Sequence, residues 1–390
     1  MTNEQFIAQN ADADVHALAL SKVPTDIDLH YCLRQIEGRQ IARRKLPSWA
    51  QTEGINYPPK LSLEQCSSEQ TAGYKLQLVE CLLPENRQNI VDLTGGFGID
   101  FSFLARTFEE ADYVEQNEQL CEIACHNFPL LGLSKARVHH KTCEDFIDGM
   151  GRFSLIYLDP SRRDTAGRKM VALSDCSPDI ETLQDTLLNH APLAIVKLSP
   201  MLDIQDTLRR LPSTSEVHVV SVDGECKEVL LVLCREKTGI TYHCINITAQ
   251  PQTFCTDTRD AEPIIAPHPE HYLYEPNASI MKAGVQNVLC RHFDVKKLHP
   301  FSHLFTSEQL IADFPGRIFE IEDYSSFAKK DLKGLLTGIS QCNLTIRNFP
   351  SSVAKLRKQL KLREGGNTYL FATTLSDGSH ALLRCTPPKP

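Results

Sequence analysis

The chain has 390 residues, of which 42% are hydrophobic and 23% are charged. These proportions are typical of globular proteins and exclude an intrinsically disordered chain, a collagen-like repeat and a coiled coil. No run of about 18 apolar residues is present to span a membrane, and the polar first residues lack the pattern of a secretory signal. The length predicts two or three domains.

The fourteen cysteines are scattered singly and form no Cys-x-x-Cys pair. Together with the missing export pattern, this predicts reduced, mostly buried thiols in a cytoplasmic protein. His139-His140 and His299/His303 lack ligand-spaced partners, and Cys121 and Cys125 sit at helical spacing in an apolar stretch, so no metal is expected.

The formal net charge of −8 is unevenly distributed. Residues 321–390 contain eleven Lys or Arg against five Asp or Glu, a local charge of +6, whereas residues 1–320 carry −14. Such an asymmetry predicts that one module meets a polyanion and that the rest of the chain does not.

The first 85 residues have the pattern of helices. Residues 28–46 carry apolar side chains near a period of 3.6, which predicts one long helix. Ser67 and Gln70 have the spacing of a capping box and predict a further helix that runs toward Leu83.

From residue 89 to 236, short β-rich runs alternate with helical runs. The expected strands are residues 90–93, 112–116, 136–140, 155–159, 193–198, 217–222 and 229–234. The expected helices are residues 100–107, 118–127, 144–149, 179–188 and 204–211. This alternation predicts an α/β fold with a doubly wound, seven-stranded sheet. The last two strands have too short a link for a crossover helix, so they should pair antiparallel.

The remainder of the chain has an α+β pattern. We expect strands near residues 240–248, 317–321, 343–349, 368–374 and 381–385, and helices near 277–293, 326–336 and 351–360. The Pro- and Thr-interrupted residues 249–269 are expected to form an irregular loop.

A glycine-rich turn, residues 91–100, follows the first expected strand. Gly96 and Gly98 would let a ligand approach the backbone closely. Glu115 ends the second strand about 20 residues later, where a carboxylate can bind ribose hydroxyls. The third glycine of a dinucleotide-binding motif is absent. Asp92 before the two glycines instead fits S-adenosylmethionine (SAM) enzymes, where it would face the cationic methionyl end.

Further segments resemble class I SAM-dependent methyltransferases, a Rossmann-like family. Residues 113–120 are similar to the second motif of that family, and Thr142 and Cys143 fall where such folds contact adenine. The fourth strand ends in Asp159-Pro160-Ser161-Arg162, at the sheet edge where ligands of open α/β folds bind. The cofactor-binding residues predicted in this way are Asp92, Thr94, Gly95, Gly96, Gly98, Glu115, Thr142 and Cys143.

The catalytic residues predicted at this edge are Asp159, Pro160 and Arg162. Their sequence departs from the (Asp/Asn)-Pro-Pro-(Tyr/Phe) signature of amino-group methyltransferases, in which a side-chain oxygen and a backbone carbonyl accept hydrogen bonds from the target NH₂. Asp159 and Pro160 retain these acceptors. Arg162 stands in for the missing aromatic residue by stacking on a base or binding phosphate. For Arg163, a solvated loop position is an equally good interpretation.

A second arrangement points to different chemistry. Ribose 2′-O-methyltransferases use a Lys-Asp-Lys-Glu tetrad in which a lysine deprotonates the hydroxyl. Lys75, Asp159, Lys197 and Glu228 occur in this order and at suitable strand positions. Both a base amino group, such as guanine N2, and a ribose hydroxyl therefore remain candidate acceptors.

The resemblance extends over nearly the whole chain after the N-terminal helices. Residues 91–105 are similar to the first motif of small-subunit ribosomal-RNA guanine-N2 methyltransferases. Residues 272–284, 344–350 and 365–375 resemble bacterial methyltransferases with a ferredoxin-like insert and a C-terminal THUMP-like domain. This family implies an RNA substrate, rRNA or tRNA. In RNA-modifying enzymes, THUMP usually precedes the catalytic domain, whereas here it follows.

The resulting domain organisation has four regions. They are a helical N-terminal region (1–85), a methyltransferase domain (86–236), a ferredoxin-like or linker module (237–320) and a THUMP-like RNA-binding domain (321–390). An RNA-binding protein with a non-catalytic SAM site is the alternative from another functional class. The sequence does not indicate an oligomeric state.

The expected RNA contacts come from a basic stretch near the C-terminus. Residues 347–363 contain six basic residues and no acidic one, namely Arg347, Lys355, Arg357, Lys358, Lys361 and Arg363. Within it, Val353, Leu356 and Leu360 are expected to share the packed face of a helix. The opposite face would present cations to phosphates, and Arg39, Arg43 and Arg44 could extend that surface.

Overall fold

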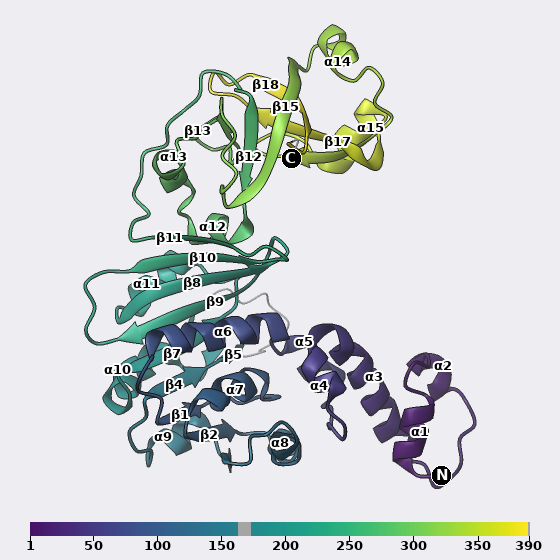
Figure 1. Ribbon diagram of the computed structural model, residues 1–390, viewed down its shortest axis with the longest axis vertical. Helices are drawn as coiled ribbons and strands as arrows, with labels where there is room; N and C mark the ends of the chain where they lie inside the picture. Colours follow the sequence, from purple (N-terminus) through teal and green to yellow (C-terminus); the bar gives the residue numbers. More distant parts are fainter. Residues whose placement is uncertain (163–172, 389–390) are drawn as a thin grey trace. The chain divides into compact units, whose positions relative to one another are not determined.

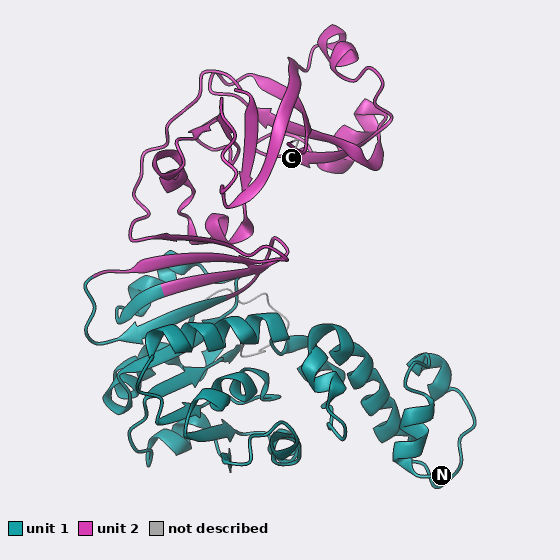
Figure 2. Ribbon diagram, in the orientation of Figure 1, with its two compact units in different colours: residues 1–216, 229–238 teal, residues 217–228, 239–390 magenta. Residues whose placement is uncertain are grey.

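The structure is a computed structural model that describes residues 1–162 and 173–388. The chain forms two compact units. Unit 1 contains residues 1–216 and 229–238, and unit 2 contains residues 217–228 and 239–390 (Figure 2). All predicted site residues before Glu228 belong to unit 1, and the basic stretch belongs to unit 2.

The N-terminal part of unit 1 is helical, as predicted (Figure 1). Its helices are α1 (Asn3–Gln9), α2 (Val15–Ala19), α3 (Leu29–Lys45), α4 (Pro47–Gln51), α5 (Lys60–Gln65) and α6 (Glu69–Leu82). The predicted capping box at the start of α6 is wrong by one residue. Ser68 is the cap, since its hydroxyl accepts a hydrogen bond from the Thr71 amide, whereas the Ser67 hydroxyl points to Asp100.

The predicted parallel sheet forms the centre of unit 1. Its strands are β1 (Asn89–Asp92), β2 (Glu110–Glu115), β3 (Ala136–His140), β4 (Leu155–Leu158), β7 (Leu193–Leu198) and β9 (Glu225–Cys234), the first four residues of which belong to unit 2. They lie in the order β9-β7-β4-β1-β2-β3. The pairs from β7 to β3 are parallel, and β9 runs antiparallel to β7. The carboxyl ends of β1, β2, β4 and β7 therefore meet at one edge.

Helices connect these strands close to the expected positions. They are α7 (Ile99–Leu104), the short η1 (Ala105–Thr107), α8 (Glu118–Leu130), α9 (Cys143–Ile147), α10 (Ile180–His190) and α11 (Ile204–Arg210). Two-residue strands β5 (Ser161–Arg162) and β6 (Cys176–Ser177) pair after β4, with the short η2 (Leu173–Asp175) before β6. Such short elements have no periodicity by which the sequence could reveal them.

Unit 2 contains strands in the order β11-β10-β8, of which β8 begins with three residues of unit 1. They are β8 (Thr214–Val222), β10 (Thr241–Ile247) and β11 (Gln252–Thr256). The prediction of an irregular loop over 249–269 is wrong for β11, which pairs antiparallel with β10. Phe254 is the buried side chain of this short strand, so its hydrophobic pattern is too weak to be recognised.

A second sheet organises the rest of unit 2, in the order β13-β14-β12-β15-β18-β17-β16. Its strands are β12 (Tyr272–Pro276), β13 (Lys296–Lys297), β14 (Phe305–Ser307), β15 (Gly316–Ser326), β16 (Gln341–Ile346), β17 (Arg363–Thr374) and β18 (His380–Thr386). The associated helices are α12 (Ala278–Ala283), η3 (Gln286–Val288), α13 (Leu289–His292), α14 (Lys329–Leu335) and α15 (Val353–Leu360). The predicted single helix 277–293 is wrong, because Gly284 ends α12 in the left-handed conformation with φ 73°.

The described residues contain no helix that is both long and apolar enough to cross a membrane. All fourteen cysteines lie in the described part of the chain, and each is a free thiol. Cys81, Cys125 and Cys255 are exposed, and the others are buried or partly buried, in agreement with the prediction of mostly buried thiols.

Candidate active site

The turn between β1 and α7 is shaped by three glycines with different roles. A Cβ at Gly95 would lie 2.1 Å from the ring of Tyr113. Gly98 has a φ of 82°, and its Cβ would lie 2.9 Å from the ring of Phe128. Gly96 also has a positive φ, 56°, but the nearest atom to its Cβ would be a backbone oxygen at 3.8 Å. Packing thus requires Gly95 and Gly98, whereas Gly96 leaves the backbone open to a ligand.

Glu115 holds the open side of this turn. Its two carboxylate oxygens accept hydrogen bonds from the backbone amides of Gly96 and Asn117, each at 2.8 Å. The carboxylate is therefore fixed beside Gly96 at the partly exposed end of β2. An oriented acceptor next to an open glycine backbone fits the hydroxyls of a ribose.

Asp92 lies at the end of β1 and is buried. Burial raises the pKa of its carboxyl to about 8, although the Thr94 amide donates a hydrogen bond of 2.9 Å to it. The Thr94 hydroxyl in turn accepts a hydrogen bond of 2.6 Å from the Asp159 amide. These bonds connect the ends of β1 and β4. A cationic ligand group beside Asp92 would compensate the buried carboxylate, which fits the predicted contact with SAM.

Behind the turn, Asp100 is the centre of a buried charged cluster. Its carboxylate lies 3.0 Å from the Lys75 ammonium and 3.4 Å from the Lys197 ammonium. The hydroxyls of Ser67 and Tyr157 donate hydrogen bonds of 2.7 and 2.8 Å to it. Burial would raise the pKa of Asp100, but the two lysines and Ser67 hold it below its usual value. The cluster joins α6, α7, β4 and β7.

Lys197 links this cluster to Asp159. Its ammonium lies 2.5 Å from Oδ2 of Asp159, and its side chain is 12% exposed against 39% for Asp159. The other carboxylate oxygen, Oδ1, has no hydrogen-bond partner among the described residues. Asp159 therefore presents one oxygen outward while Lys197 holds the other.

The remaining predicted catalytic residues follow Asp159 directly. Pro160 is buried, and the backbone of Arg162 pairs with Cys176 in the small β5–β6 sheet. Arg163 lies outside the described residues. The stacking role of Arg162 stays a prediction.

Thr142 and Cys143 begin α9 after β3. The Thr142 hydroxyl is engaged as the helix cap, since it accepts a hydrogen bond from the Asp145 amide at 3.1 Å. Cys143 is buried, and burial raises the pKa of its thiol to about 12. Its thiol is therefore protonated at neutral pH and suited to apolar contact with a ligand rather than to nucleophilic chemistry.

The structure brings together Lys75, Lys197 and Asp159 of the tetrad considered above. Glu228 is buried in β9 and belongs to unit 2. Neither Asp100 nor Tyr157 was predicted as a site residue, and Ser67 was predicted only as a helix cap. Asp100 is the last residue of the glycine-rich turn, residues 91–100. The sequence signal that could have identified it is an acidic residue in the first turn of the helix that follows the glycines.

The basic stretch of unit 2 forms α15 and its flanks. Lys355, Lys358, Lys361 and Arg363 are exposed, whereas Arg357 is paired with Glu364 at 2.6 Å. Leu356 is buried, and Leu360 packs against the same core cluster. The expectation that Val353 joins this face is wrong, since Val353 is 39% exposed in the first turn of the helix.

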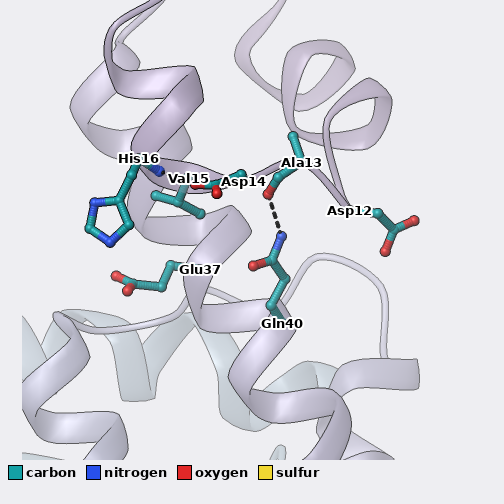
Figure 3. Close-up of a pocket in the computed structure, with 7 residues that line it drawn as sticks. All are labelled: Asp12, Ala13, Asp14, Val15, His16, Glu37 and Gln40. Carbon is teal, nitrogen blue, oxygen red and sulfur yellow. Dashed lines mark hydrogen bonds between the residues drawn. The ribbon is translucent and has the colours of Figure 1, made fainter.

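A hollow of about 450 Å³ lies among the N-terminal helices (Figure 3). Figure 3 shows the acidic side chains of Asp12, Asp14 and Glu37 around it, with Gln40 bonded to the Ala13 carbonyl. None of its lining residues belongs to the cluster around Asp100. Because its lining is acidic, this hollow is unsuited to RNA phosphates, and the candidate site remains at the β1–β4 edge.

Comparisons with known proteins find matches to two domain families and to a whole solved chain. A ferredoxin-like domain family matches residues 272–315, and a THUMP domain-like family matches residues 316–387. The chain is 32% identical to the "putative methyltransferase" from Porphyromonas gingivalis W83, with a TM-score of 0.87 to its crystal structure. This match covers 99% of the present chain and 98% of the other. No curated protein matches the chain.

Two further solved structures resemble the chain over about half its length. A "putative RNA methyltransferase" from Pyrococcus horikoshii is 11% identical, with a TM-score of 0.36, and the match covers 50% of this chain and 98% of that one. An O-methyltransferase from Bacillus cereus in complex with S-adenosylhomocysteine is 13% identical, with a TM-score of 0.37, covering 52% and 98%.

Proposed function

The chain belongs to the methyltransferase family represented by the Porphyromonas gingivalis protein, and we propose that it transfers the methyl group of SAM to RNA. The observation that carries the proposal is the pair of contacts made by Asp159. Lys197 donates a hydrogen bond to one oxygen of the Asp159 carboxylate, and the Asp159 backbone amide donates one to the Thr94 hydroxyl in the glycine turn. The acceptor side and the cofactor side of the site are thereby joined by one short hydrogen-bonded path.

We propose that the cofactor contacts Asp92, Thr94, Gly95, Gly96, Gly98, Glu115, Thr142 and Cys143. Glu115 would bind the ribose hydroxyls, and Asp92 would face the cationic methionyl end. When bound, SAM supplies an electrophilic methyl carbon. The chain's own contribution is to orient the ligand along the β1–β2 edge and to exclude water with the packed aromatic side chains behind Gly95 and Gly98.

The acceptor is, in this proposal, a base amino group such as guanine N2. Oδ1 of Asp159 and the Pro160 carbonyl would accept hydrogen bonds from the target NH₂ and so aim its lone pair. Lys197 fixes the carboxylate in this orientation through its contact of 2.5 Å with Oδ2. Asp159 is thus a positioning and electrostatic group, and it needs no proton transfer before methyl transfer.

A ribose hydroxyl as acceptor would require a different state of the same cluster. A lysine that deprotonates a hydroxyl must be neutral, yet Lys197 lies 2.5 Å from one carboxylate and 3.4 Å from another. These two contacts hold the Lys197 side chain against carboxylates and not against a substrate hydroxyl. Lys75 is fully buried behind Asp100 and is unsuited to contact a substrate. The geometry therefore favours the amino group.

The THUMP-like match to residues 316–387 supports RNA as the substrate class, with the exposed basic residues of α15 as phosphate contacts. We propose that the chain comprises the four regions expected from its sequence: the helical region 1–85, the methyltransferase domain 86–236, the ferredoxin-like or linker module 237–320 and the THUMP-like domain 321–390. A cytoplasmic location is consistent with the free thiols.

The test is methylation of RNA taken from cells that lack the protein, followed by mass spectrometry of the nucleosides. We expect a base-methylated guanosine to appear only with SAM and the wild-type chain. A 2′-O-methyl nucleoside would shift the assignment to the ribose tetrad. SAM binding without any methylated nucleoside would identify an RNA-binding protein with a non-catalytic site.

A further inference from the structure

An exposed phenylalanine stands at the tip of the β13–β14 hairpin in unit 2. Lys296 and Lys297 pair with Thr306 and Phe305, so residues 298–304 form the connecting loop. We call residues 299–303 the Phe301 tip. Phe301 is 77% exposed, whereas the neighbouring Leu298 and Leu304 are buried. A single exposed apolar side chain is ordinary, so the argument rests on how this one is held and on what surrounds it.

Buried groups fix the conformation of the Phe301 tip. The buried Lys297 ammonium donates hydrogen bonds to the Pro300 carbonyl at 2.6 Å and to Asn287 at 3.0 Å. Burial lowers the pKa of Lys297, as expected for a cation removed from water. The buried Ser302 hydroxyl bonds to that of Thr373 at 3.1 Å. The loop therefore presents Phe301 on an ordered support and does not leave it on a free coil.

The tip is joined to the end of β16, where a cation lies. Nδ1 of His299 lies 3.1 Å from both the Phe301 amide and the Asn348 side-chain amide. The residue before Asn348 is Arg347, whose side chain is 42% exposed. The ring of His299 also lies 5.6 Å from that of Phe301. The contact between His299 and Asn348 thus joins the Phe301 tip to the segment that carries Arg347, about 50 positions away in sequence.

A buried carboxylate orients the cations of this surface. Glu275, whose side chain is 8% exposed, lies 2.5 Å from Arg347. It also accepts a hydrogen bond of 2.8 Å from Nε of Arg317, which is 52% exposed. One buried negative charge therefore holds two half-exposed guanidinium groups, which leaves a net charge of +1. Guanidinium groups held in this way retain free N–H donors for a phosphate.

We propose that the Phe301 tip, together with Arg347 and Arg317, binds single-stranded RNA, with Phe301 stacked on an unpaired base and the arginines on its phosphates. This inference rests on the proposed RNA substrate and adds a second contact surface to α15. Stacking on an exposed aromatic ring beside cations is the way proteins bind unpaired nucleotides without reading sequence. A protein partner would more often bury a larger apolar patch, whereas here the apolar group is one ring among polar and charged neighbours.

The test is fluorescence anisotropy of the full chain with a labelled, unstructured RNA of about 12 nucleotides and with a labelled RNA duplex. Phe301→Ala should weaken binding of the single strand about tenfold and that of the duplex less than twofold. Phe301→Tyr should bind like wild type, and Phe301→Leu should lose as much as the alanine variant. The matched control is Tyr324→Ala, which removes a 41% exposed aromatic side chain of the same unit and should change nothing.

The outcomes separate this inference from the proposed function. If the wild type binds the single strand and Phe301→Ala binds it equally well, the inference is overturned and the RNA proposal stands. If Phe301→Leu retains full binding, the ring does not stack and the inference is likewise overturned. If the wild type binds neither RNA, both proposals fail. Unchanged thermal unfolding and SAM affinity of each variant show that the fold is intact.

Discussion

Two groups of cations, one in each unit, contrast in their surroundings. In unit 1, Lys75 is fully buried and Lys197 nearly so, and both lie against the carboxylate of Asp100. In unit 2, Lys355, Lys358 and Lys361 are exposed on and beside α15. A buried cation needs partners to offset its lost hydration, so its position is fixed by them. An exposed cation is solvated and contributes mainly through its field, as one of a group.

This difference predicts that the buried cations determine the geometry of the active site and that the exposed cations determine the affinity for RNA. The interior cluster of unit 1 determines where Asp159 points, and each of its members should be indispensable. The surface of unit 2 determines how strongly a polyanion is held, and its members should be interchangeable. Substitutions in the two units test whether the effects divide in this way.

The largest effect should come from Lys75. Lys75→Ala leaves the buried Asp100 with only part of its compensation, and we expect unit 1 to lose about 3 kcal/mol of stability. Trp49 is the single tryptophan and is fully buried in unit 1, so its fluorescence during urea unfolding reports this loss. The double variant Lys75→Met with Asp100→Asn should recover most of the stability. A loss below about 1 kcal/mol in the single variant would show that the cluster is not a buried ion pair network.

The next effect concerns Asp159. Asp159→Ala should lower kcat about a hundredfold and change the dissociation constant of SAM less than twofold, since the carboxylate faces the acceptor. Asp159→Asn retains an oxygen acceptor and should keep more activity than the alanine variant if a base amino group is methylated. Single-turnover kinetics and calorimetry measure the two quantities. Equal losses in both variants, with a 2′-O-methyl product, would favour the ribose tetrad.

A smaller effect with a defined pH dependence is expected for Asp92. Its folded-state pKa, about 8, lies above the usual 3.8, so the unfolded chain ionises first as the pH rises. The contribution of Asp92 to the free energy of unfolding is therefore fully present below about pH 4 and is lost as the pH rises to about 8. Asp92→Asn removes this loss and should raise the Tm of the ligand-free protein at pH 8 by roughly 5 °C. The same variant should show no gain at pH 4.

The same residue should couple cofactor binding to pH. Ionised Asp92 attracts a cation, so the affinity of the wild type for SAM should increase between pH 6 and pH 9. In Asp92→Asn the affinity should be about tenfold lower at pH 9 and independent of pH. Calorimetry at several pH values checks this, and a pH-dependent affinity in the variant would exclude Asp92 as the titrating group.

The strands and turns that have a clear local sequence pattern could be predicted from the sequence. The strands of unit 1 are apolar runs bounded by turns, and the glycine turn lies directly after the first of them. The Asp100 cluster could not be predicted, because Ser67 and Lys197 approach it from 33 and 97 residues away. Ser67 and Ser68 are equally suited to cap α6 by type, and only the long-range partner of Ser67 decides between them. Strand β12 is buried at four of its five positions, including Glu275, so its sequence lacks the polar–apolar alternation that would identify a strand.

The smallest effects per residue belong to α15. Charge reversal of Lys355, Lys358 and Lys361 to Glu should weaken RNA binding about tenfold at low salt, and equally for unrelated sequences, because phosphates carry no sequence information. The slope of log affinity against log salt should flatten by about 0.7 to 0.9 for each lost contact. Arg357→Glu should change this slope less than reversal of an exposed lysine does, since Arg357 is already paired with Glu364.

The control for this prediction is a reversal of exposed lysines in unit 1. Lys22→Glu with Lys135→Glu changes the net charge of the chain without touching α15 or the active site. If general charge determined RNA affinity, this variant would lose in proportion to the charges reversed. We expect instead an unchanged salt slope, because Debye screening at physiological ionic strength confines the field of a surface charge to about 8 Å. Equal slopes for the α15 variant and the wild type would show that this helix presents only a solvated face and that RNA is bound elsewhere.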